Sequence, residues 1–138
     1  MTFQANTDDF KATSDTTAGL AKGTIVLTLR GEVAVEDLRV GDKVITRDVG
    51  AQPLRGLNYH SGESAIVAKH SFGTNRPVRD MRVSVAQPFL MRDDGPIFAT
   101  ARLIAQDSHS RMENTPLYRL VFDRSHVIYA DGAELAVA

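Results

Sequence analysis

Beyond Thr24 the chain alternates apolar and polar residues over short runs, with the period of two that is typical of β-strands. Residues 24–35 predict a hairpin, because apolar runs lie on both sides of a turn at Arg30-Gly31-Glu32. A one-turn acidic connector at 35–38 then leads through the tight turn Val40-Gly41-Asp42 to another strand at 44–46. Further strands are expected at residues 64–69, 81–85, 89–92, 97–99, 117–122 and 127–130.

Glycine and proline separate these segments at the short, regular spacing of an all-β domain. We interpret Gly50, Pro53, Gly56 and Gly62 as such breaks. The single helix expected, at about residues 99–104, is short. Many short strands with frequent turns predict an all-β fold of the sandwich or barrel kind.

The first 17 residues break the pattern, because they are polar and rich in Thr, Asp and Ser. Such a segment buries too little apolar surface to order itself. We therefore expect a loosely ordered leader at 1–17 and one globular domain at 18–138.

Composition narrows the classes of function. The formal net charge of −1 gives no basic surface for nucleic acid or an anionic membrane, so neither is expected as a partner. The sequence has no signal peptide and no apolar run near the roughly 20 residues of a membrane span, which makes the cytoplasm the default location. It also lacks cysteine, and its four histidines are too scattered to form a metal site, so no metal or cofactor is expected.

Residues 19–48 carry a specific resemblance, in the run GLAKGTIVLTLRGEVAVEDLRVGDKVITRD. Three later blocks follow in order, at 52–55, 79–84 and 120–132. Together they resemble the Hint domains shared by Hedgehog autoprocessing regions and inteins, and are most similar to the bacterial Hint branch. The resemblance covers about residues 18–132. It implies a compact, pseudo-twofold, all-β horseshoe in which the two chain ends converge on the active site.

The resemblance also implies a chemistry. In such domains a Cys, Ser or Thr attacks the carbonyl of the preceding residue and turns an amide into a thioester or ester. A histidine in a Ser/Thr-x-x-His block protonates the leaving nitrogen, and a further histidine near the final strand assists the later step.

When the catalytic roles that the resemblance implies are assigned to this sequence one position at a time, most of the positions lack the side chain that the role needs. The nucleophile position, four residues before Gly23, is Gly19, which has no side chain to attack with. The proton-donor block reads Ser84-Val85-Ala86-Gln87, so it retains the hydroxyl of Ser84 but has Gln87 in place of histidine. An amide has no proton to exchange near neutral pH.

The third position implied by the resemblance is Ser125, with His126 one residue further on. Because side chains alternate across a strand, this displacement points His126 at the opposite face unless a bulge intervenes.

Two classes of function follow. In the first, a degenerate Hint domain serves as a binding or structural module, holding its own leader or another extended peptide segment where the catalytic groups are absent. In the second, the domain processes itself with a substituted hydroxyl such as that of Thr17, Thr16 or Ser14. The second needs an imidazole as base, for which His126, His70 and His109 are the candidates.

Overall fold

The computed structural model describes residues 18–91, 97–105 and 113–137. The leader expected at 1–17, with Thr17, and the candidate base His109 lie outside the described residues. No helix within the described ranges is long and apolar enough to cross a bilayer.

The described chain consists mostly of strands, which confirms the all-β prediction. One short α-helix, α2 (Ala101–Ala105), and one 3-10 turn, η2 (Val35–Asp37), accompany them. The strands are β1 (Leu20–Ala21), β2 (Ile25–Thr28), β3 (Gly31–Ala34), β4 (Lys43–Thr46), β5 (Gly50–Pro53), β6 (Gly56–Val67), β7 (Met81–Ser84), β8 (Pro88–Met91), β9 (Ile97–Thr100), β10 (Glu113–Val121), β11 (His126–Ala130) and β12 (Ala133–Val137).

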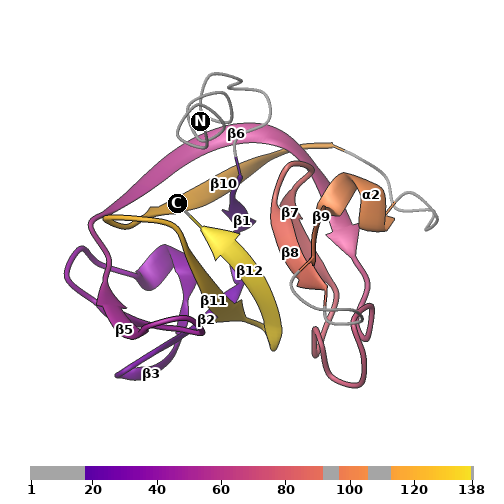
Figure 1. The fold of residues 1–138 in the computed structure, drawn as a ribbon. Coiled ribbons are helices and arrows are strands. Elements are labelled where there is room, and N and C mark those ends of the chain that lie inside the picture. Colours follow the sequence, from indigo (N-terminus) through magenta and orange to yellow (C-terminus); the bar gives the residue numbers. More distant parts are fainter. Residues whose placement is uncertain (1–17, 92–96, 106–112, 138) are drawn as a thin grey trace, which may run out of the picture.

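These strands form two units that share one core. β1, β10, β6 and β7 close into a small barrel, and the other strands form a sheet in the order β3-β2-β4-β11-β12-β8-β9, with β5 added at β4. The long strand β6 arches over the molecule beside β10, with β12 beneath them (Figure 1). Closure of the barrel brings β1, at the start of the described chain, between β10 and β7.

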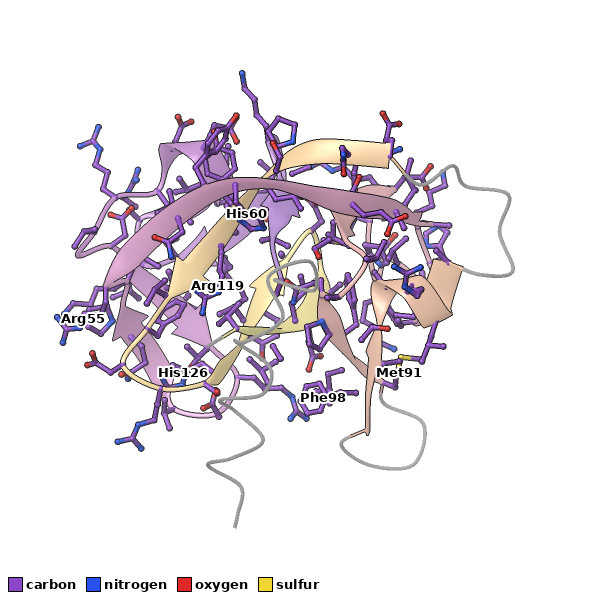
Figure 2. All side chains as sticks on the ribbon, turned by 90° about the horizontal axis from the view of Figure 1, so that it is seen from above. Arg55, His60, Met91, Phe98, Arg119 and His126 are labelled. Atoms are coloured by element: carbon purple, nitrogen blue, oxygen red, sulfur yellow. The ribbon has the colours of Figure 1, made fainter. Side chains whose placement is uncertain are left out.

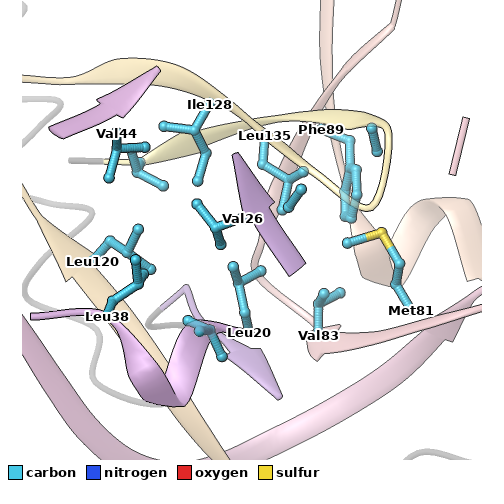
Figure 3. Close-up of a cluster of buried hydrophobic side chains, with 14 of the residues drawn as sticks. Leu20, Val26, Leu38, Val44, Met81, Val83, Phe89, Leu120, Ile128 and Leu135 are labelled. Atoms are coloured by element: carbon cyan, nitrogen blue, oxygen red, sulfur yellow. The ribbon is translucent and has the colours of Figure 1, made fainter. Parts of the chain in front are cut away.

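Side chains from both units make up the core. Leu20 of β1, Val26 of β2, Phe89 of β8 and Leu135 of β12 are at most 1% exposed and belong to one cluster (Figure 3). The ring of Phe89 also stacks on Phe72, with centroids 5.2 Å apart. The two ends of the described chain are therefore packed into the same core.

The hairpin predicted at 24–35 is present as β2 and β3, with its turn one residue earlier than expected. Thr28 pairs with Gly31, which leaves Leu29 and Arg30 as the two loop residues. Gly31 has φ +101°, a conformation that residues other than glycine rarely adopt.

Several predicted boundaries were wrong. Gly50 and Pro53 are not breaks but the first and last residues of β5, which among the described strands pairs with β4 alone and so tolerates proline as an edge strand does. Likewise Gly56 and Gly62 lie within β6, which extends far beyond the predicted strand 64–69 because β10 pairs along it. The sequence analysis also missed β12, and the helix begins at Ala101 because residues 99 and 100 belong to β9.

Candidate functional site

Gly19 lies immediately before β1, against the turn that the resemblance assigns to the proton donor. Leu20 pairs with Tyr118 of β10 on one side and with Val83 of β7 on the other. The backbone N–H of Ser84 donates to the Gly19 carbonyl oxygen at 2.9 Å. The fold thus brings together the first and second positions that the sequence analysis singled out.

There is little room for a side chain at Gly19. A Cβ atom built there would lie 3.0 Å from Leu117 Cβ, 3.2 Å from His60 Cε1 and 3.3 Å from the Tyr118 carbonyl oxygen. Two of these three atoms are backbone or Cβ atoms, which move only if β10 moves. The neighbours of Gly19 therefore leave little space for a side chain at this position.

His60 is the imidazole next to this position, and the sequence analysis did not single it out. It lies on β6, where Figure 2 labels it, and the strand pairing places it directly across from Leu117 of β10. Its place depends on the register between two strands far apart in the sequence. The only local signal was a histidine in a region read as turns, which is too weak to identify it.

Ser84 is buried, and its hydroxyl takes part in a local turn. The Ala86 N–H donates to Ser84 Oγ at 3.1 Å, and the Gln87 N–H donates to the Ser84 carbonyl oxygen at 3.0 Å. This turn connects β7 to β8 and sets the direction in which Gln87 points.

Gln87 is 1% exposed and ties β8 to β12. Its Nε2 donates to the carbonyl oxygens of Pro88 at 3.0 Å and of Ala136 at 2.8 Å. An amide nitrogen has only two hydrogens, so both are used inside the fold. The side chain at the position that the resemblance assigns to the general acid thus acts as a structural link to the last strand.

The third position is arranged differently. Ser125 is exposed just before β11, whereas His126 is buried. His126 Nδ1 lies 2.9 Å from Asp48 Oδ2, and its ring packs edge-on against Phe122. The three atoms nearest to a Cβ at Gly19 belong to β6 and β10 and include none of His126.

Asp48 holds the start of β11 in place. Its Oδ1 also accepts a hydrogen bond from the Val127 N–H at 3.2 Å. Partial burial on its own would raise the pKa of the Asp48 carboxyl, but the bonds from His126 and Val127 outweigh it and the pKa is lowered. The ionised carboxylate therefore stabilises the folded state.

We expect Asp48→Asn to reduce the free energy of unfolding by about 0.5–1 kcal/mol at pH 7, a small value because the carboxylate is partly exposed. A carboxyl with a lowered pKa stabilises the fold above its unfolded pKa, about 3.9, and this contribution is lost as the pH falls through the folded pKa. Urea unfolding at pH 7 and pH 3 should show a difference that is smaller at pH 3 than at pH 7. Asp123→Asn is the control, because Asp123 pairs with Arg55 at the surface. An equal loss of unfolding free energy in both variants would contradict the assignment of this stabilisation to the Asp48 carboxylate.

No group of three or more His, Asp or Glu side chains within the described ranges is placed to hold a metal ion. The groups that the described structure brings together at this site are Gly19, the 84–87 turn and the imidazole of His60.

Solved structures that are similar to this chain in fold include inteins and an intein-like domain. The bacterial intein-like domain from Clostridium thermocellum is 18% identical, with a TM-score of 0.63, over 88% of this chain and 97% of that one. The DnaB intein from Synechocystis sp. PCC 6803 is 9% identical, with a TM-score of 0.66, over 88% and 99%. The gp41-1 intein is 14% identical, with a TM-score of 0.62, over 86% and 97%.

No curated protein matches the sequence. The family model for the Hint domain matches residues 18–136, which include every strand of the barrel and all but one residue of the last strand. The match also spans Gly19, Ser84, Gln87 and His126. The chain therefore belongs to the Hint domain family, as its sequence resemblance implied.

Proposed function

We propose that this Hint domain does not process itself and acts as a binding or structural module. The observation that carries the proposal is the packing at Gly19. The position has no side chain, and Leu117, His60 and Tyr118 approach within 3.0–3.3 Å of where one would begin. A nucleophile there would need both a different residue and a rearranged neighbourhood.

The contacts of Gln87 support the same proposal. Protonation of a leaving nitrogen needs a group that exchanges a proton near neutral pH, which an amide does not. Both hydrogens of this amide are already donated to carbonyl oxygens of the fold. Gln87 is thus suited to holding β12 rather than to catalysis.

A second candidate, self-processing through a substituted hydroxyl such as that of Thr17, is favoured by one observation. The imidazole of His60 lies beside Gly19, so a possible base is close to the start of the domain. General base catalysis by a positioned histidine is worth about 10²- to 10⁴-fold in rate.

Intact-mass spectrometry of the freshly purified chain separates the two functions. We expect the full 138-residue mass, unchanged after long incubation with hydroxylamine, because nothing at Gly19 can form an ester or thioester. If the second candidate is correct, the chain loses the residues that precede Thr17 or Gly19, and this cleavage does not occur in Thr17→Ala. Such Thr17-dependent cleavage would overturn the proposal.

A further inference from the structure

The turn between β11 and β12 holds a carboxylate inside the fold. Ala130 pairs with Ala133, so Asp131 and Gly132 are the two loop residues of this hairpin. Both have positive φ, +49° and +85°, as a type I′ turn requires, and aspartate adopts this conformation more readily than most residues. The Asp131 N–H donates to the Ile25 carbonyl oxygen of β2 at 2.8 Å. The Asp131 side chain is only 3% exposed, so its charge lies away from water.

The connection between β6 and β7, residues 68–80, packs on this turn. The Val78 N–H donates to the Asp131 carbonyl oxygen at 2.8 Å. A Cβ atom built on Gly132 would lie 2.6 Å from the Asn75 carbonyl oxygen, so the two backbones are in direct contact. Asp131 therefore joins the 68–80 connection to the sheet through its own backbone.

The charge of the Asp131 carboxylate is only partly compensated. Arg79 Nε lies 3.3 Å from Asp131 Oδ1, but this buried oxygen accepts no hydrogen bond from a described residue. Loss of hydration is the largest influence and raises the pKa of the Asp131 carboxyl. The charge of Arg79 and the backbone N–H of Ile25 act against this rise, whereas the negative charge of Glu32 on β3 adds to it.

We propose that Asp131 is a pH-sensitive switch for this contact, and that the 68–80 connection is held more firmly on the β11–β12 turn when the carboxyl is protonated. Opening of the contact lets water reach the carboxylate, whereas the closed contact favours the neutral acid, which has no charge to hydrate. Protonation gives up the attraction of Arg79, but this attraction is weak because the Arg79 side chain is 59% exposed.

The sign of the pH dependence follows from proton binding. Because the closed contact binds the proton of Asp131 more tightly than the open one, a fall in pH shifts the equilibrium towards the closed contact. The inference adds a regulatory device and is independent of the proposed function, since neither Gly19 nor Gln87 takes part in these contacts.

Hydrogen exchange of the full chain labelled with ¹⁵N, followed by NMR between pH 4 and pH 7, tests the switch. After correction for the intrinsic pH dependence of exchange, the opening constant of the Val78 amide should be about threefold or more larger at pH 7 than at pH 4. In Asp131→Asn this pH dependence should disappear, because asparagine also tolerates positive φ but has no carboxyl to titrate.

Asp80→Asn is the matched control, because it removes a carboxylate from the same connection, where Asp80 accepts a hydrogen bond from the Lys69 N–H. The pH dependence of the Val78 opening constant should persist in this variant. A wild-type opening constant that does not change with pH, or the same pH dependence in Asp131→Asn, would overturn the inference.

A titration of the wild-type chain labelled with ¹³C measures the carboxyl directly, without any substitution at Asp131. Its signal should titrate with a midpoint above about 3.9, the value of an ordinary aspartate, and the Nε signal of Arg79 should follow the same midpoint. Arg79→Gln should raise the midpoint and Glu32→Gln should lower it, because they remove an attractive and a repulsive charge. A midpoint at or below about 3.9, or shifts of the opposite sign in the two variants, would refute the switch.

Discussion

Gln87→Glu is expected to lower the free energy of unfolding by about 3 kcal/mol or more at pH 7. The new carboxylate oxygens would face the carbonyl oxygens of Pro88 and Ala136, to which the amide of Gln87 now donates at 3.0 and 2.8 Å. A buried carboxylate without donors repels these oxygens and loses its hydration. The side chain would then hold its proton in the folded state to a higher pH than in the unfolded chain.

The pH dependence of this loss has a definite sign. A carboxyl whose folded pKa is raised makes the folded chain bind more protons, so stability falls as the pH rises above its unfolded pKa of about 4.3. Urea unfolding at several pH values should therefore show the deficit of Gln87→Glu shrinking toward pH 4. Gln52→Glu is the control, because Gln52 lies on the edge strand β5, and should change stability by less than about 0.5 kcal/mol. Equal effects at the two positions would show that Gln87 does not link β8 to β12.

Gly19→Ala is expected to cost about 2 kcal/mol of stability, as overpacking of a filled site does. The single added carbon would lie 3.0 Å from Leu117 Cβ and 3.3 Å from the Tyr118 carbonyl oxygen, so β10 has to shift. Thermal or urea unfolding measures the loss.

Gly56→Ala is the matched control, since Gly56 also contacts β10. A Cβ atom there would lie 3.5 Å from Val121 Cβ, which is an ordinary contact. We expect no loss, or a gain of up to about 0.5 kcal/mol, because alanine restricts the unfolded chain. If both alanine variants are equally stable, the site at Gly19 has room for a side chain and the proposed function loses its main support.

The local pattern predicted much of the fold. The hairpin of β2 and β3, the turn η2 and the strands β4, β7, β8 and β11 were all found near the expected positions, because period-two alternation and turn residues are local signals. β12 was missed because its sequence, AELAV, contains one β-branched residue, Val137, and no aromatic residue, and its position between β11 and β8 stabilises it instead. The strand predicted at 64–69 missed the first half of β6, because that half is a strand only through its pairing with β10.

The residues of the candidate site likewise divide into those that the sequence identified and those that only the structure located. The resemblance assigned Gly19 and Gln87 to the nucleophile and proton-donor positions from their places along the chain. It did not find His60 beside Gly19, since their proximity follows from the pairing of β6 with β10. The sequence analysis also predicted no partner for His126. In the structure its Nδ1 contacts the carboxylate of Asp48, which lies in the connection between β4 and β5.

By itself, the sequence determined which chemical groups this domain has: no side chain at position 19, an amide at 87 and hydroxyls or imidazoles elsewhere. Only the tertiary structure decided what surrounds them, including the tight packing at Gly19, the link from Gln87 to β12 and the contact of His126 with Asp48. The physical reason is that reactivity depends on covalent identity, which is local. Packing, hydrogen bonding and ion pairing instead depend on strand registers between segments far apart in the chain.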